Sequence, residues 1–194
     1  MKHMAWTAAL AALMAVGASA QDKGKIGGEA KYLKLKDAMK DDVEIDLAQH
    51  KGKEPVVLVW ISEKCDITWR YEGRTGELMK EFGPKGVKFY AVWSSAADTQ
   101  QGIKKYAESK NYVMPVLDDA KGELARFYGV NVTPTYVVID KDGKFRYRGA
   151  YDDLQLGGGY KNDPNTAKQK FVHEALTAIL EGKEPAVTEK KGVG

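Results

Sequence analysis

The chain has 194 residues, with 30 Lys and Arg against 27 Asp and Glu, and a single cysteine. This length suits one domain with a substantial core, and a net charge of +3 gives no case for a nucleic acid or a membrane surface as partner. One cysteine also excludes an intramolecular disulfide.

The first 20 residues have the pattern of a secretory signal peptide. Lys2 is followed by an apolar run from Ala5 to Val16 and then by Ala18-Ser19-Ala20, an A-x-A cleavage site. We expect residues 1–20 to be removed before Gln21 and the protein to be exported, either to a periplasm or to the extracellular space. The apolar run is too short to span a bilayer and no later stretch is longer, so we expect no membrane span.

After the signal peptide the sequence predicts one domain over residues 21–185 and a flexible, lysine-rich tail over residues 186–194. Apolar and charged residues alternate around Leu33 and Leu35, and again from Val43 to Leu47. Both stretches are typical of half-exposed strands.

The centre of the sequence lies between Val56 and Arg74. Five apolar residues, Val56 to Trp60, predict a strand that is buried on both faces. Residues 62–64 break this run, and a helical stripe of apolar residues then predicts a helix that starts at Cys65. The only cysteine therefore lies where a strand passes into a helix, and the free N–H groups of a helix start favour a thiolate. The alternative is an inert cysteine that packs as a small apolar residue.

The next segments predict a parallel sheet. Residues 83–86 form a Gly-Pro stop signal, Val87 to Trp93 predicts a second buried strand, and a helix ends near Lys110. A strand, a helix and a strand at this spacing form a right-handed βαβ unit. Val113 to Leu117 predicts a short strand, and Pro115 places it at an edge or a bulge.

The last part of the chain predicts two helices and a hairpin. In order, we expect a short helix over Gly122 to Tyr128, a hairpin formed by Val130 to Asp140 and Lys144 to Gly149, a loop over Tyr151 to Asn165, and an amphipathic helix over Asn165 to Glu181.

This order of elements resembles the thioredoxin fold, an α/β fold of three layers with a central mixed β-sheet flanked by helices. Cys65 occupies the place of the first cysteine of the C-x-x-C motif, and Thr133-Pro134 resembles the cis-proline loop that faces that cysteine. Residues 137–144 are similar to the stretch that follows this loop in redoxins. From about residue 43 to residue 180 the chain resembles exported, thioredoxin-like redoxins of the alkyl hydroperoxide reductase and thiol-specific antioxidant superfamily.

The sequence also departs from these families. Thr68 replaces the second cysteine of the motif, so dithiol exchange within the motif is impossible. Peroxiredoxins have Pro and Thr or Ser seven and three residues before their reactive cysteine, where this chain has Leu58 and Ser62. Pro134 stands near the place of a peroxiredoxin arginine, and the C-terminal end has no resolving cysteine.

The resemblance implies a single-cysteine oxidoreductase with antioxidant activity and no cofactor. The Cys65 thiolate would reduce a peroxide or a disulfide, and an external thiol or a thioredoxin-like protein would act as reductant. The alternative is a redox-inactive thioredoxin-fold binding module, in which the groove between Cys65 and Pro134 holds a partner without electron transfer. The fold does not decide between them, because function depends on the site.

Four other residues are candidates for supporting roles at Cys65. The backbone of Thr133 would align an extended substrate, Ser62 matches half of the peroxiredoxin pattern, and Thr68 would either bond the thiolate or simply begin the helix. Arg74 lies on the apolar stripe, so its charge needs a partner. A structural ion pair is the favoured role for Arg74, ahead of direct action at Cys65.

The remaining polar residues give no further site. His50 and His173 are isolated, so the sequence predicts no metal site. Asp152 and Asp153 form either a carboxylate pair or, as the favoured interpretation, part of a solvated loop. No G-x-S-x-G motif is present, so hydrolase chemistry has no support.

Overall fold

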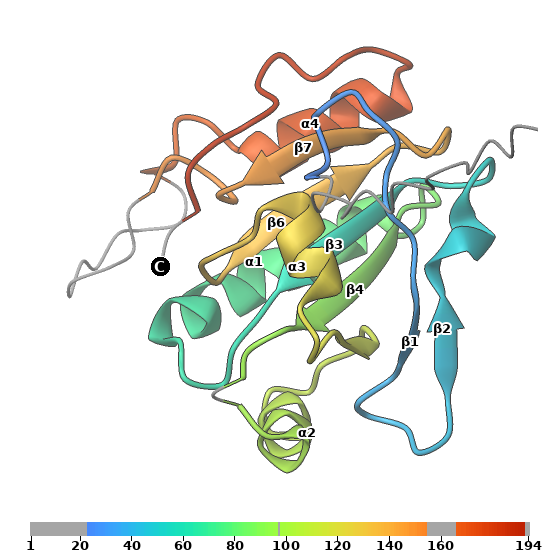
Figure 1. Ribbon diagram of the computed structural model, residues 1–194. Helices are drawn as coiled ribbons and strands as arrows, with labels where there is room; N and C mark the ends of the chain where they lie inside the picture. The colour runs from blue at the N-terminus through green and yellow to red at the C-terminus, as the bar shows by residue number, and fades with distance from the viewer. Residues whose placement is uncertain (1–22, 97, 155–165, 193–194) are drawn as a thin grey trace, which may run out of the picture.

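The computed structural model describes residues 23–96, 98–154 and 166–192. The predicted signal peptide lies outside these residues. A five-stranded sheet in the order β5-β4-β3-β6-β7 crosses the domain (Figure 1). Its strands are β3 (Val56–Trp60), β4 (Lys88–Trp93), β5 (Val116–Asp118), β6 (Thr135–Ile139) and β7 (Phe145–Gly149).

Parallel and antiparallel pairs are mixed in this sheet. β3 pairs parallel with β4 and antiparallel with β6, and all five of its residues are buried because neighbours cover it on both edges and both faces. β5 is an edge strand and begins after Pro115, which lacks the N–H that a ladder needs. The predicted βαβ unit, edge strand and hairpin are therefore confirmed.

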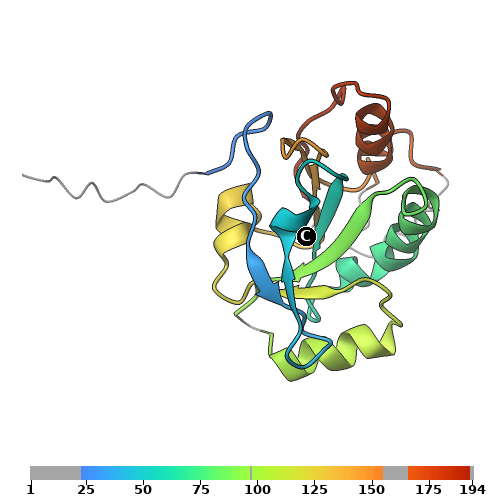
Figure 2. The same ribbon diagram turned by 90° about the vertical axis from the view of Figure 1, so that its right-hand side faces the viewer.

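Helices cover the sheet on both faces. They are α1 (Asp66–Phe82), α2 (Gln100–Ser109), α3 (Glu123–Tyr128) and α4 (Phe171–Leu180). In Figure 2, α3 lies on one side of the sheet and α1 and α4 lie on the other. Two apolar clusters separate these layers, and each fully buried large apolar side chain contributes roughly 1.5–3 kcal/mol. The three-layer α/β thioredoxin-like fold is confirmed.

A small hairpin precedes the sheet. Strands β1 (Lys34–Lys36) and β2 (Glu44–Asp46) pair antiparallel, and the 3-10 helix η1 (Leu47–His50) follows them. Leu35 and Ile45 lie opposite each other and pack against the α3 side of the core. The two half-exposed strands predicted here are therefore present.

The final helix is shorter than predicted. We expected it to begin at Asn165, which lies outside the described residues, but α4 begins at Phe171. The polar residues before it bond to the chain after β7 instead: Lys168 N–H donates to Asp153 Oδ1 at 3.0 Å, and Gln169 C=O accepts from Asp153 N–H at 3.1 Å. These contacts hold residues 168–169 outside the helix.

The tail also differs from the prediction. Instead of lying free, it pairs with β7: Arg148 N–H donates to Thr188 C=O, and Lys190 N–H donates to Arg148 C=O, both at 3.0 Å. β7 is the last strand of the sheet, so its outer N–H and C=O groups need partners. The tail supplies them at Arg148, and Gly27 and Gly28 supply them at Phe145.

Candidate functional site

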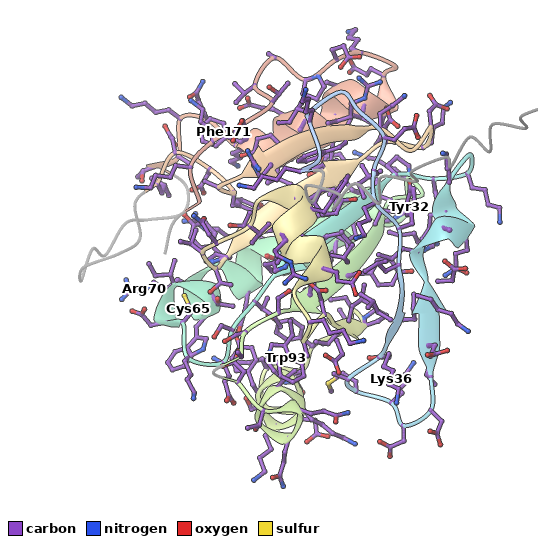
Figure 3. The ribbon with its side chains drawn as sticks, viewed as in Figure 1. Tyr32, Lys36, Cys65, Arg70, Trp93 and Phe171 are labelled. Carbon is purple, nitrogen blue, oxygen red and sulfur yellow. The ribbon has the colours of Figure 1, made fainter. Side chains whose placement is uncertain are left out.

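Cys65 lies at the carboxyl end of the central strand. The chain leaves β3, continues through Ile61, whose N–H donates to Val92 C=O at 3.0 Å, and turns at Ser62. Ser62 C=O accepts from Cys65 N–H at 3.3 Å, which closes the turn directly before α1. Cys65 is the N-cap of α1 and is half-buried (Figure 3).

The loop before β6 faces this cysteine. The Thr133–Pro134 peptide bond is cis, and the Cys65 Sγ donates to Thr133 C=O at 3.0 Å. The pairing of Trp60 with Thr135 across β3 and β6 sets this approach, because it places the end of one strand beside the start of the other. The backbone of Thr133 therefore lies next to the sulfur.

Few side chains are bonded at the start of α1. Cys65 makes no side-chain cap bond, and its sulfur is directed to Thr133 C=O. Asp66, the one acidic residue of the first turn, lies 3.8 Å from Arg70. One turn further, Trp69 is 47% exposed, and the Lys110 ammonium lies 5.2 Å from its ring centroid.

A cavity of about 330 Å³ is lined by Ser62 and Thr133, the two residues whose carbonyl groups accept hydrogen bonds from Cys65, so it lies beside this cysteine. The residues around it come from the carboxyl ends of β3 and β4, from α3 and from the loop before β6: Trp60, Ile61, Ser62, Ser94, Ser95, Ala125, Val130, Asn131, Val132 and Thr133. Trp60 is held in place, because its Nε1–H donates to Ser94 Oγ at 3.0 Å and Ser94 donates to Asp119 Oδ2 at 2.6 Å. The cavity is thus largely pre-formed, and its volume suits one side chain or a small organic group.

Ser62 supports the loop and not the sulfur. Its hydroxyl donates to Asp98 Oδ1 at 3.3 Å and accepts from Lys64 N–H at 3.2 Å. Asp98 is buried, and its second oxygen, Oδ2, has no hydrogen-bond partner. Ser62 therefore ties the turn that carries Cys65 to the segment after β4.

Of the two roles considered for Thr68, the bond to the Cys65 sulfur is absent. The Thr68 side chain is buried, and its hydroxyl has no hydrogen-bond partner. As the cap of the helix, Cys65 directs its sulfur across to Thr133, whereas Thr68 follows the inward stripe of α1. Thr68 is accordingly a residue of the core at the start of the helix.

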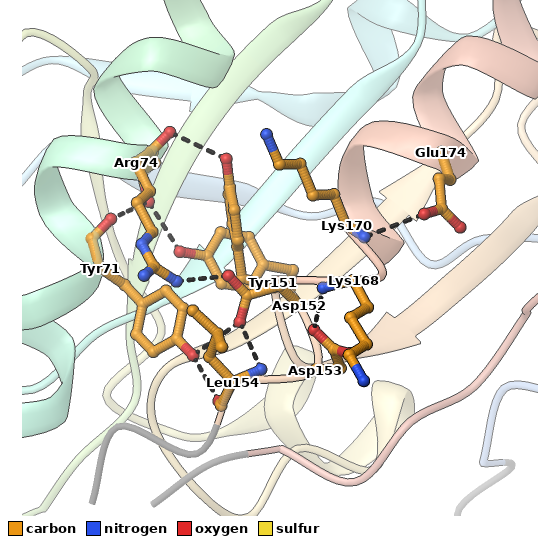
Figure 4. A network of polar contacts seen from close by, with 11 residues as sticks. Tyr71, Arg74, Tyr151, Asp152, Asp153, Leu154, Lys168, Lys170 and Glu174 are labelled. Carbon is orange, nitrogen blue, oxygen red and sulfur yellow. Dashed lines mark hydrogen bonds and ion pairs between the residues drawn. The ribbon is translucent and has the colours of Figure 1, made fainter. Parts of the chain in front are cut away.

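Arg74 forms a buried ion pair two turns along α1. Its Nη1 bonds to Asp152 Oδ2, and the Tyr71 hydroxyl donates to Asp152 Oδ1 at 3.0 Å (Figure 4). Tyr151 adds a bond from its hydroxyl to Arg74 C=O at 3.2 Å. We call these four residues the anchor network. It takes Arg74 away from the sulfur and joins α1 to the segment after β7.

The expectation of a solvated Asp152 is wrong. The residue is 3% exposed, and burial raises the pKa of its carboxyl, although the Leu154 N–H and Arg74 oppose this rise. Asp153 is exposed, so the two neighbours do not form a carboxylate pair. The sequence signal for Asp152 was the unpaired charge of Arg74 on an apolar stripe, which required a buried acid elsewhere in the chain.

Sequence reasoning also missed Asp98. It lies after the carboxyl end of β4, at the same edge of the sheet as Cys65. Among the described residues, no group of three or more His, Cys, Asp or Glu side chains is placed to hold a metal ion. Nor does any helix in that part of the chain combine the length and the apolar character needed to cross a membrane.

Comparison with known proteins agrees with this geometry. The chain is similar to the thiol-disulfide oxidoreductase ResA of Bacillus cereus, with 31% identity over 128 residues that cover 65% of this chain and 70% of the relative. Among solved structures it is similar to an uncharacterized conserved protein from Geobacillus kaustophilus, with a TM-score of 0.72, 29% identity and 87% coverage of both chains.

The likeness in fold extends to the thioredoxin domain of a thiol-disulfide oxidoreductase from Bacteroides vulgatus. That structure has a TM-score of 0.55 and 18% identity, with 62% of this chain and 85% of that chain covered. The sequence profile of the AhpC/TSA family matches residues 26–148. Because this match spans more than half of the chain, the protein belongs to the AhpC/TSA family.

Proposed function

We propose that this protein is an exported thiol-disulfide oxidoreductase that works with one thiol, Cys65. The observation that carries the proposal is the position of the Cys65 sulfur, at the N-terminus of α1 and 3.0 Å from the carbonyl that precedes cis Pro134. Membership of a thioredoxin-like family and the resemblance to ResA support the same chemistry.

The reaction begins with attack of the Cys65 thiolate on one sulfur of a substrate disulfide. The S–S bond of the substrate breaks, a mixed disulfide forms at Cys65, and the second sulfur leaves as a thiolate. The described segments of the chain contain no other cysteine, and the whole sequence has only this one. An external thiolate, from a small thiol or a thioredoxin-like protein, must therefore attack the mixed disulfide and restore Cys65.

Peroxide reduction is the second candidate for the same sulfur. The thiolate would attack one oxygen, the O–O bond would break, an alcohol or water would leave, and Cys65 would become a sulfenic acid. One external thiol would convert this acid to a mixed disulfide and water, and a second would release Cys65. This route has less support, because two residues that were candidates to assist Cys65 are engaged elsewhere. Ser62 bonds to Asp98, and Arg74 bonds to Asp152.

The test compares the wild-type protein with Cys65→Ser. With an oxidised peptide and excess small thiol, the wild type should exchange disulfides and carry a transient mixed disulfide at Cys65, detected by intact mass, while Cys65→Ser does neither. The second route is tested with one equivalent of hydrogen peroxide in place of the peptide. It should add one oxygen to the wild-type protein, detected by intact mass. Equal, negligible rates in both proteins would refute the oxidoreductase proposal and favour a redox-inactive binding module in the groove between Cys65 and Pro134.

Export is the second part of the proposal and rests on the pattern of residues 1–20. The extracytoplasmic protein should begin at Gln21, which intact mass after cell fractionation measures directly. Soluble cytoplasmic protein that retains Met1 would overturn it.

A further inference from the structure

The C-terminal segment, residues 188–192, continues the sheet beyond β7. The two backbone hydrogen bonds between Arg148 and this segment, to Thr188 C=O and from Lys190 N–H, are those of a short parallel pair. The Arg148 guanidinium bonds to the Glu189 carboxylate and also donates to Tyr128 C=O at 2.6 Å. The segment is therefore held by backbone and side-chain contacts.

Gly149 makes this close approach possible. Its φ is +142°, and a Cβ added there would lie 1.9 Å from Lys190 C=O. Any larger residue would push the C-terminal segment off β7. A glycine at the last position of the strand is thus matched to the segment beside it.

A parallel partner of β7 runs toward the start of β6, because β6 and β7 are antiparallel. The segment accordingly ends at the loop that faces Cys65. A Cβ on Gly192 would lie 2.6 Å from Val132 Cγ2 and 2.7 Å from Thr135 Oγ1. Gly192 and the Cys65 sulfur therefore contact the same four-residue loop, residues 132–135.

Val132 links this contact to the site, since it also lines the cavity beside Cys65. The backbone of Gly192 packs directly against the Val132 side chain, with no room between them even for a Cβ. We propose that the C-terminal segment determines substrate size at Cys65: it holds the loop against the cavity and admits narrow, extended disulfides while it hinders bulky ones. The nature of the substrate rests on the proposed function, but the restriction of access to the sulfur does not.

The test removes Thr188 to Gly194 and keeps Val187, which packs against the core. Cys65 is the only thiol in the sequence, so the rate of thiol modification measures the access of a reagent to its sulfur. Iodoacetamide serves as the small probe and a fluorescein maleimide as the bulky one. We compare the rate at which the maleimide modifies Cys65 with the rate for iodoacetamide. Deletion should raise this ratio by about tenfold, the scale on which an apolar pocket discriminates by size. A ratio unchanged in a protein with wild-type circular dichroism would overturn the proposal.

A point substitution repeats the test without shortening the chain. Gly149→Ala should displace the segment and raise the same ratio. The matched control is Gly52→Ala, which also places a side chain at positive φ, +79°, but has no atom within 4 Å of the added Cβ. An equal ratio in the two variants would contradict the proposal. Disulfide exchange by the wild type is measured separately. If that assay fails while the ratio of modification rates rises in the variants, only the proposed function is rejected and the role of the C-terminal segment stands.

Discussion

The first turn of α1 and the part of the same helix that enters the anchor network are bonded very differently. In the first turn, the Cys65 sulfur makes one hydrogen bond, and the buried Thr68 hydroxyl makes none. Further along, Arg74 and Tyr71 both bond to the buried Asp152 carboxylate. The position of the helix is therefore fixed beyond the site, by contacts that do not involve the sulfur.

The difference shows how a reactive sulfur can have few hydrogen bonds within a well-ordered fold. An unsatisfied buried hydroxyl costs about 1–3 kcal/mol, and a sulfur with few partners adds little stability. Because residues in the anchor network join α1 to the segment after β7, the first turn does not have to hold the helix. If this account is right, damage to the anchor network should reduce stability, and damage to the first turn should not.

Alkaline pH should have the largest effect, because tyrosines concentrate around the anchor network. Burial raises the pKa of Tyr71 and Tyr136, and it raises that of Tyr151 to about 12. In the unfolded chain tyrosine ionises near pH 10, so at high pH the native state binds more protons than the unfolded state. The contribution of these protonated tyrosines to the free energy of unfolding is fully present below pH ~10. It is lost as the pH rises toward and through their pKa values in the folded protein.

The measurement follows tyrosinate absorbance and far-ultraviolet circular dichroism together as the pH rises from 8 to 13. We expect most phenolates to appear in one step with the loss of structure. Gradual ionisation centred near pH 10, with the circular dichroism intact, would show that these hydroxyls are open to water.

Arg74→Met should be the most damaging single substitution. It leaves the Asp152 carboxylate buried without its cation, and breaking such a pair costs about 3–5 kcal/mol. The control is Arg70→Met, which removes an exposed partner of Asp66 on the same helix and should cost about 0.5 kcal/mol or less. Urea unfolding measures both.

The double variant Arg74→Met with Asp152→Leu separates charge from packing. Replacing both charges by apolar side chains should recover much of the loss, since no buried charge is then unpaired. A loss below about 1 kcal/mol in Arg74→Met alone would show that the anchor network does not fix α1.

The sequence was most informative where structure depends on neighbouring residues. The apolar runs at β3 and β4 and the Asp-Gly turn between β6 and β7 are local signals, and they gave the sheet and its hairpin. The placement of Thr133 and Pro134 opposite Cys65 came from the family resemblance, because no local pattern brings residues 68 positions apart together.

The features that sequence reasoning missed are all long-range. The carboxylate that pairs with Arg74 is 78 residues away, and the tail differs from a loose end only because an edge of β7 is free to receive it. The start of α4 was misplaced for the same reason, since Asp153 bonds the residues before it. The burial of Thr68 and the lack of a hydrogen-bond partner for its hydroxyl also depend on the packing of α1 in three dimensions.

The smallest effects should come from the same substitution at two positions of α1. The Thr75 hydroxyl donates to Tyr71 C=O at 2.9 Å and shares a 2.7 Å hydrogen bond with the Tyr136 hydroxyl, so Thr75→Val leaves a buried phenol without this partner. We expect a loss of about 1–2 kcal/mol in urea unfolding.

Thr68→Val should behave in the opposite way. It removes a buried hydroxyl that has no partner and keeps a side chain of nearly the same shape, so stability should be unchanged or higher by up to about 1 kcal/mol. The rate at which iodoacetamide modifies Cys65 should also stay within about twofold, because the hydroxyl makes no bond to the sulfur. A much slower modification at wild-type stability would mean that Thr68 does support the thiolate, and the first turn of α1 would then be more fully bonded than this structure shows.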